Sequence, residues 1–168
     1  MSFLLWTGII VVAYYVVQEP NINATVIGGY DHPKVRLPGS GGSQEIAAWA
    51  KRCYIMTPHQ KRRFPEKVEF MTSAGSIRGK GDRENAGLRG GGMLAVVTDI
   101  GMLEPDKTGE MILTALHPDK TAEQAKENTG WDLKVAAQLR TTEFVTENEL
   151  RILREELDPT GIYLKGSG

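Results

Sequence analysis

The sequence predicts an α/β fold in which an open, mostly parallel sheet is flanked by helices. The first observation is the order strand, glycine-rich loop, helix and strand across residues 34–57, which is typical of a crossover between parallel strands. The second is a pair of helix-start patterns, Thr121–Gln124 and Thr146–Glu149, in the later part of the chain. Because 168 residues are enough for one core and few for two, we expect a single domain over residues 1–168.

Charge and cysteine content exclude several classes of function. The chain has 20 Lys and Arg against 21 Asp and Glu, so its net charge of −1 creates no overall field that attracts nucleic acid or an acidic membrane. Cys53 is the only cysteine, which excludes a disulfide within the chain and fits a reducing compartment. The histidines at 32, 59 and 117 lack metal-ligand spacing, so we expect no metal.

The apolar run Phe3–Val17 is predicted to form one or two buried strands. No basic segment precedes it, and it falls short of the roughly 18 apolar residues of a membrane span. Its β-branched and aromatic residues, interrupted by Gly8, favour strand structure. We therefore expect a cytoplasmic protein that neither crosses nor binds a membrane.

The stretch from Leu37 to Ala50 is the feature around which the other elements are arranged. Pro38 keeps the chain extended, the glycines that follow allow left-handed backbone angles, and Ser43 is the expected N-cap of a helix over residues 44–51. A glycine turn before a helix directs backbone N–H groups into one small space, which suits an anion or a developing oxyanion. The candidate residues are Gly39, Ser40, Gly41, Gly42 and Ser43. The alternative is a tight connection without a ligand.

A basic cluster follows the next predicted strand, Cys53–Thr57. Its cationic members are Lys61, Arg62 and Arg63. The carboxyl end of a strand is where open α/β sheets collect their ligands, so these side chains are candidates for a phosphate or carboxylate clamp. The alternative is a solvated turn with ion pairs to nearby glutamates.

The remaining chain is predicted to alternate strands and helices. The expected elements are a strand at Val68–Met71, a long glycine-rich loop over 73–92, a strand at 93–99 that continues through 102, a hairpin turn at 104–110, a strand at 111–116, a helix from Thr121 to Asn128, a strand at 133–136 and a helix at 147–156. The last helix carries an apolar stripe that includes Leu150, Leu153 and Leu157, so we expect it to dock on another surface.

Several separate segments, taken in order, resemble the β subunit of class I CoA-transferases, of the glutaconate and 3-oxoacid type. They are residues 21–28, 32–42, 61–64, 97–99, 129–135 and 150–163, within a resemblance that covers 21–164. The resemblance implies a CoA-transferase-like fold of the NagB/RpiA type, a partner α subunit, and acyl-CoA with a carboxylic acid as substrates. It implies no covalently bound cofactor, with coenzyme A as the ligand.

The resemblance also implies ping-pong chemistry, in which a glutamate attacks the thioester carbonyl and the glycine loop encloses the reacting group. In the family that glutamate lies near the start of the β chain, and this chain is expected to lack the family's N-terminal part. Neither Glu19 nor Glu84 matches the glutamate segment, so we assign no catalytic residue and expect the chain to be inactive alone.

The sequence leaves three functions open. The first is a protein like the CoA-transferase β subunit that takes part in CoA transfer, and the second is the pocket-forming subunit of a CoA-thioester hydrolase. The third is a non-catalytic domain that associates with itself. Because an exposed sheet edge must be covered or paired, we expect a homo-oligomer.

Overall fold

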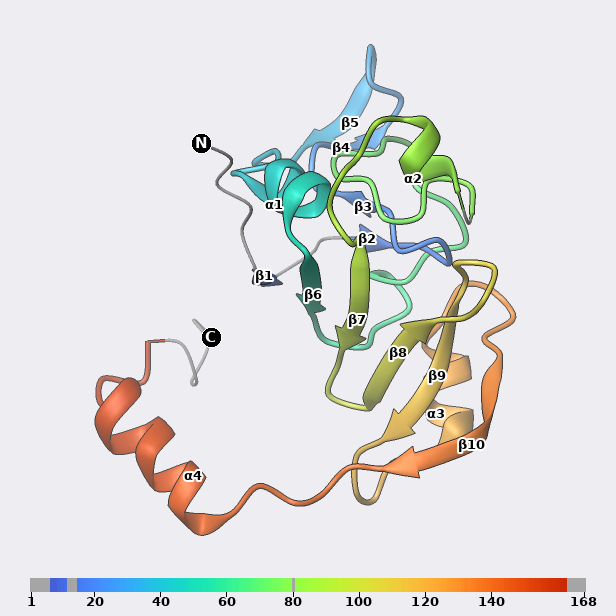
Figure 1. Ribbon diagram of the computed structural model, residues 1–168. Helices are drawn as coiled ribbons and strands as arrows, with labels where there is room; N and C mark the ends of the chain where they lie inside the picture. The colour runs from blue at the N-terminus through green and yellow to red at the C-terminus, as the bar shows by residue number, and fades with distance from the viewer. Residues whose placement is uncertain (1–6, 12–14, 80, 163–168) are drawn as a thin grey trace.

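The computed structural model describes residues 7–11, 15–79 and 81–162 (Figure 1). Its main sheet has six strands in the order β1 (Thr7–Val11), β6 (Arg52–Met56), β7 (Met93–Val97), β8 (Gly101–Pro105), β9 (Met111–Leu116) and β10 (Val135–Thr141). The pairs β1–β6, β6–β7 and β9–β10 are parallel, whereas β8 runs antiparallel to both of its neighbours. The prediction of an open, mostly parallel sheet is confirmed.

Two short antiparallel pairs lie beside this sheet: β2 (Tyr15–Val16) with β3 (Ile22–Asn23), and β4 (Val26–Gly28) with β5 (Pro33–Arg36). The sequence predicts one or two strands in the apolar N-terminal run, and β1 and β2 confirm this for residues 7–11 and 15–16. Residues 3–6 and 12–14 of that run lie outside the described residues.

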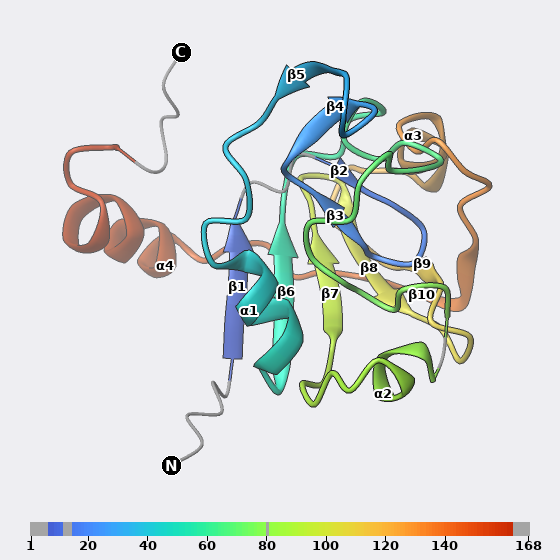
Figure 2. The same ribbon diagram turned by 90° about the horizontal axis from the view of Figure 1, so that it is seen from above.

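Helix α1 (Ser43–Trp49) connects the glycine loop to β6 and lies on one face of the sheet (Figure 2). Its buried Ala47 belongs to the same core cluster as Cys53 and Ile55, which alternate with more exposed residues along β6. The predicted order of strand, loop, helix and strand is confirmed, but the first strand, β5, pairs antiparallel with β4 outside the main sheet, so the segment is not a crossover between parallel strands of one sheet. The prediction of Ser43 as N-cap is wrong: Gly42 occupies that position, and the Ser43 hydroxyl bonds to the hydroxyl of Ser73 at 2.8 Å instead.

The strand predicted at Val68–Met71 does not form. The chain here bends, and its contact with β3 is a single bridge between Ile22 and Ser73. The Ile22 carbonyl accepts both the Thr72 and the Ser73 N–H groups, so no regular ladder continues along this segment.

The glycine-rich segment 73–92 contains a short helix, α2 (Asp82–Asn85), and is anchored by a buried arginine. The Arg83 guanidinium donates to the carbonyls of Ala74 and Gly75 through Nη1 and to that of Ala47 through Nη2, each at 2.8 Å. Burial lowers the pKa of Arg83 from its usual value. One side chain thus joins α1 to this segment.

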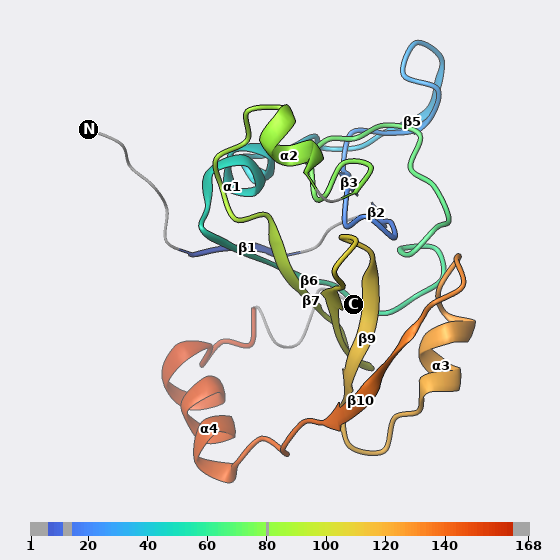
Figure 3. The same cartoon turned by 45° about the vertical axis from the view of Figure 1, so that its right-hand side comes forward.

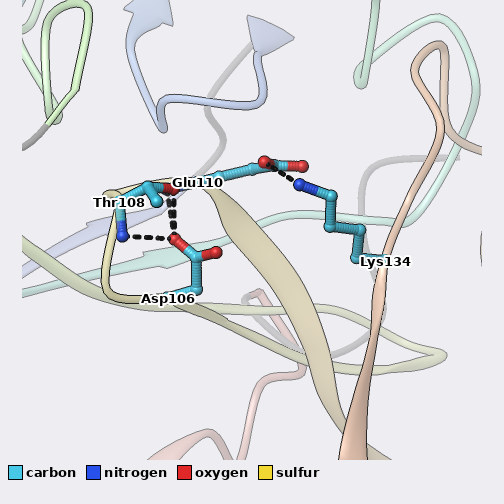
Figure 4. A network of polar contacts seen from close by, with 4 residues as sticks. All are labelled: Asp106, Thr108, Glu110 and Lys134. Carbon is cyan, nitrogen blue, oxygen red and sulfur yellow. Dashed lines mark hydrogen bonds and ion pairs between the residues drawn. The ribbon is translucent and has the colours of Figure 1, made fainter.

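The strand predicted to continue from 93 through 102 is wrong, because the chain turns at 98–100 and β8 pairs antiparallel with β7. The hairpin turn between β8 and β9, predicted at residues 104–110, is confirmed (Figure 4). The Asp106 carboxylate accepts the Thr108 N–H at 2.7 Å and the Thr108 hydroxyl at 2.6 Å, and these bonds lower the pKa of Asp106. Next to the turn, the Lys134 ammonium donates to the Glu110 carboxylate at 2.6 Å. This ion pair ties the start of β9 to the segment that leads into β10.

The last two helices begin with the capping boxes that the sequence predicts. Thr121 caps α3 (Ala122–Glu127), and Thr146 caps α4 (Glu147–Arg151), which continues into a π-helical turn, η1 (Ile152–Leu157). The strand expected at 133–136 begins at Val135 and extends further, to Thr141, and Leu133 just before it is buried in the core cluster.

Within the described chain the last helix docks on no other element, so the expectation that it docks on another surface stays a prediction. No residue of α4 or η1 is buried, and Figures 2 and 3 show α4 standing apart from the sheet. Among the described helices, none is long and apolar enough to cross a membrane.

Candidate functional site

The carboxyl ends of β6 and β7 and the N-terminus of α1 lie along one edge of the sheet. This follows from topology, because α1 leads directly into the start of β6 and the two strands are parallel. Both sets of predicted residues, the glycine loop and the basic cluster, therefore belong to the same edge.

The glycine loop adopts the left-handed backbone angles expected from its sequence. The φ angles are 94° at Gly39, 54° at Gly41 and 105° at Gly42, in the region that side-chain-bearing residues rarely adopt. A Cβ at any of the three would meet nothing within 4 Å, so the glycines are required by backbone conformation rather than by lack of space. The loop surface remains open to a ligand.

Two hydrogen bonds fix the ends of this loop. The Gly39 N–H donates to the Ala24 carbonyl and the Ser43 N–H to the Ser40 carbonyl, both at 2.8 Å. Between them, the N–H groups of Ser40, Gly41 and Gly42 find no acceptor among the described residues. A group with unused donors of this kind can bind an anion or an oxygen that gains negative charge.

The basic cluster lies in the turn that follows β6. Lys61 and Arg62 are exposed, and the Arg62 Nε donates to the Gln60 side chain at 3.0 Å. Arg63 is half-buried, and its Nη1 lies 3.5 Å from the Thr57 hydroxyl. The three cations share one turn, but the side chains of Arg62 and Arg63 contact different neighbours.

A buried polar network lies behind this turn, and the sequence does not indicate it. The His59 ring is 3% exposed and stacks on Phe64; its Nδ1 lies 3.2 Å from the Thr98 hydroxyl and its Nε2 lies 3.0 Å from that of Thr129. The Thr98 and Thr129 hydroxyls both donate to backbone carbonyls, of Gly101 and Ala125, so each of them can accept from a ring N–H of His59. Burial lowers the pKa of His59 to about 4, and a nearby carboxylate opposes this only in part.

Asp99 joins the turn to the end of β7. Its carboxylate accepts the His59 backbone N–H at 2.6 Å, while the residue itself is exposed at the carboxyl edge. A sequence signal for Asp99 exists: a Thr-Asp sequence directly after a buried strand often places polar side chains at such an edge. Its partner cannot be read from spacing, since His59 and Asp99 are 40 residues apart.

One pocket of about 240 Å³ lies near the root of the glycine loop. Val26, Pro65 and Lys67 are among its lining residues. It is near the loop because Val26 lies two residues after Ala24, which accepts the Gly39 N–H. A second pocket, of about 250 Å³, includes Arg83 and Met93 and lies at the opposite edge, where β7 begins.

Other candidate groups are poorly placed for chemistry at this edge. Glu84 lies in α2, which precedes β7 and so belongs to the opposite edge. Cys53 is buried, and burial raises the pKa of its thiol to about 11, which disfavours a reactive thiolate. Among the described residues, no group of three or more His, Cys, Asp or Glu side chains has the geometry of a metal site.

The family model and the relatives that match this chain all point to one family. The family model described as coenzyme A transferase matches residues 5–128. The β subunit of 3-oxoadipate CoA-transferase from Pseudomonas knackmussii is 47% identical over 135 residues, which are 80% of this chain and 52% of that protein. The β subunit of glutaconate CoA-transferase from Acidaminococcus fermentans is 43% identical over 147 residues, which are 86% of this chain and 54% of that protein.

The fold agrees with these matches. The crystal structure of glutaconate coenzyme A-transferase from Acidaminococcus fermentans superposes with a TM-score of 0.86 and 39% identity, over 94% of this chain and 60% of that chain. The chain spans about half the length of the two curated relatives. The residues matched by the family model include both the glycine loop and the basic cluster.

Proposed function

The chain belongs to the coenzyme A transferase family and is similar to its β subunits, and from this premise we propose that it takes part in moving CoA from an acyl-CoA thioester to a carboxylic acid. The observation that carries the proposal is the open glycine loop, which has unused N–H donors and lies within the matched residues. Thioester exchange needs such donors because its tetrahedral intermediate carries a negative oxygen.

We assign roles to the loop and the cluster accordingly. The N–H groups of Ser40, Gly41 and Gly42 would receive the thioester oxygen, within the candidate loop Gly39–Ser43. Lys61, Arg62 and Arg63 would bind the phosphates of CoA, since they lie on the same edge of the sheet. The pocket beside Val26 and Lys67 offers space for part of the CoA chain.

The proposed partner is a CoA-transferase α subunit, because both curated relatives are named as one subunit of a larger enzyme. The substrate acid is proposed to be a dicarboxylate, because 3-oxoadipate and glutaconate in those names are both dicarboxylates. Glu84 is not proposed as the glutamate nucleophile, since it lies at the opposite edge of the sheet from the glycine loop. A cytoplasmic location is also proposed, supported by the single buried cysteine.

The first experiment titrates the purified chain with CoA and with glutaryl-CoA by isothermal calorimetry. We expect heat of binding, and we expect the double variant Lys61→Ala and Arg62→Ala to weaken CoA affinity about tenfold, at roughly 0.7 kcal/mol per exposed charge contact. The matched control replaces two exposed lysines, Lys120 just before α3 and Lys126 within it, and should leave affinity unchanged. Equal affinity in all three proteins would show that Lys61 and Arg62 form a solvated turn.

The second experiment distinguishes transfer from hydrolysis. The chain is co-expressed with a CoA-transferase α subunit, and glutaryl-CoA is supplied with and without an acceptor acid while free thiol is monitored. Transfer should yield a new acyl-CoA only when the acid is present, with no net thiol. Thiol release without an acid would instead support the hydrolase function.

The homo-oligomer remains a prediction tied to the non-catalytic alternative. Sedimentation velocity of the chain alone at micromolar concentration tests it, because a single species of 18.5 kDa is a monomer. If CoA does not bind and larger species form, the self-associating domain replaces the transferase proposal.

A further inference from the structure

Two aromatic rings and a guanidinium stack on one another at the hairpin of β4 and β5, which stands out at the top of Figure 1. The Tyr30 and Phe70 rings have centroids 4.9 Å apart and an interplanar angle of 20°. The Arg36 guanidinium carbon lies 4.8 Å from the Tyr30 ring centroid, and its Nη2 donates to the Tyr30 carbonyl at 3.0 Å. We call these three residues the aromatic stack; Tyr30 is 52% exposed, and Arg36 is exposed as well.

Other contacts already join this hairpin to the segment that carries Phe70. The Gly28 N–H donates to the Glu69 carboxylate, and the Thr72 hydroxyl accepts the Ala24 N–H at 2.8 Å. Among the described residues, the core cluster includes none of the three members of the aromatic stack. The stack therefore offers π surface to solvent, and such a surface binds nucleobases, since each base has a flat π face.

The pocket beside Val26 and Lys67 adjoins the aromatic stack. Its lining comes from the same two parts of the chain, namely Asn23, Val26 and Ile27 on one side and residues 65 and 67–69 on the other. Phe70 directly follows the last of these residues, and Tyr30 comes shortly after Ile27. The pocket and the stack are thus neighbours between the same two segments.

The glycine loop lies close to the same pocket. Strand β5 leads from Arg36 through Leu37 into the loop, and the Leu37 N–H donates to the Thr25 carbonyl at 3.0 Å. The Gly39 N–H donates to the Ala24 carbonyl at 2.8 Å, between the pocket residues Asn23 and Val26. From Arg36 to Ser40 the chain spans at most about 13 Å, at about 3.3 Å per residue.

These three features follow one another in the order of the parts of a CoA thioester. The loop suits the reacting carbonyl, the pocket has room for the pantetheine arm, and the stack suits the adenine. The adenosine of CoA also carries a 3′-phosphate. Lys34 and Arg36 lie on one face of β5, because they are alternate residues of the strand, so a phosphate beside the stack meets positive charge.

We propose that the aromatic stack binds the adenine ring of CoA, with Lys34 and Arg36 beside the 3′-phosphate. The inference rests on the proposed function, since it takes CoA as the ligand whose thioester lies at the glycine loop. It adds a separate site for the nucleotide end of the ligand. The chemistry that recognises this end is a flat base on stacked rings together with a phosphate near two cations.

The experiment titrates the full chain with three ligands by isothermal calorimetry. They are CoA, adenosine 3′,5′-bisphosphate, which is the nucleotide end alone, and glutaryl-pantetheine, which has the thioester and the arm without the nucleotide. Tyr30→Ala should weaken the binding of CoA and of the bisphosphate about tenfold each, as expected for the loss of one base-stacking side chain. Glutaryl-pantetheine should bind unchanged, because it does not reach the stack.

Three further variants control for effects on folding. Tyr30→Phe keeps the ring and should bind all three ligands like the original chain. Arg36→Ala is a second, independent change in the stack and should cause the same losses as Tyr30→Ala. Val35→Ala is the matched control, because Val35 is 47% exposed on β5 but alternates with Lys34 and Arg36 and so lies on the other face.

The three ligands separate failure of this inference from failure of the proposed function. If CoA and the bisphosphate keep their affinity in Tyr30→Ala and Arg36→Ala, or do not bind the original chain, the inference is overturned. Equal weakening of glutaryl-pantetheine would overturn it too, because the stack would then act only by supporting the loop. If the two nucleotides bind through the stack and glutaryl-pantetheine does not bind, the inference stands and the proposed role of the glycine loop fails.

Discussion

The buried imidazole of His59 makes the stability of this protein depend on pH in a predictable direction. Burial lowers its pKa from 6.5 to about 4 in the folded chain, so the unfolded chain takes up the proton first as the pH falls. His59 therefore does not reduce the free energy of unfolding above about pH 6.5, and it reduces that free energy progressively as the pH falls toward about 4. His59 is 3% exposed, so solvent screening is small.

The magnitude follows from the size of the shift. A shift of about 2.5 units at 1.36 kcal/mol per unit gives an upper limit of about 3 kcal/mol, and about 2 kcal/mol of it is lost between about pH 7 and pH 4.5. The variant His59→Gln keeps a donor and an acceptor toward Thr98 and Thr129 but does not titrate in this range.

Urea denaturation at both pH values measures the effect. The free energy of unfolding of the original chain should fall by about 2 kcal/mol more than that of His59→Gln, because the carboxylates contribute equally to both proteins. His32→Gln is the matched control, because it makes the same replacement at an exposed position. Equal losses in the original chain and His59→Gln would refute the reasoning.

The remaining predictions concern stability and are measured by denaturant unfolding at neutral pH. Replacing Arg83 by Met should lower the free energy of unfolding by about 3 kcal/mol, because three carbonyls lose a charged donor. The gain from no longer burying the guanidinium offsets part of the loss. A decrease below about 1 kcal/mol would contradict this. Replacing Thr121 by Ala should cost about 1 kcal/mol through the α3 capping box, whereas Thr121→Ser should cost little. Replacing Gly101 by Ala should prevent normal pairing of β8 and β9, since the added Cβ would lie 2.1 Å from the Ala115 carbonyl oxygen; an unchanged midpoint would show that the strands can separate there.

Local sequence patterns predict the elements whose cause is local. The glycines at 39, 41 and 42 have the positive φ angles that their residue type favours, and both threonine capping boxes start the helices expected. The hairpin between β8 and β9 also forms where the Asp106–Glu110 sequence indicates a turn. In the capping boxes and the turn, the hydrogen bonds join residues only a few positions apart.

Predictions that depend on distant partners are less reliable. The apolar alternation at Val68–Met71 is typical of a strand, but β3 offers only one bridge, at Ser73. The Ser43 hydroxyl is available to cap α1 and bonds instead to Ser73, 30 residues away. The role of His59 depends on Thr98 and Thr129, which lie 39 and 70 residues along the chain.

The sequence by itself determined the class of fold, the family resemblance, the conformation of the glycine loop and the starts of the last two helices. These depend on residue type and short spacing, which a chain carries whether or not it is folded. Only the tertiary structure decided that the glycine loop and the basic turn share one edge, that His59 is buried and neutral, and that α4 stands apart from the sheet. Those features arise from pairing and burial between distant segments, because strand order and register set which surfaces meet and which remain exposed.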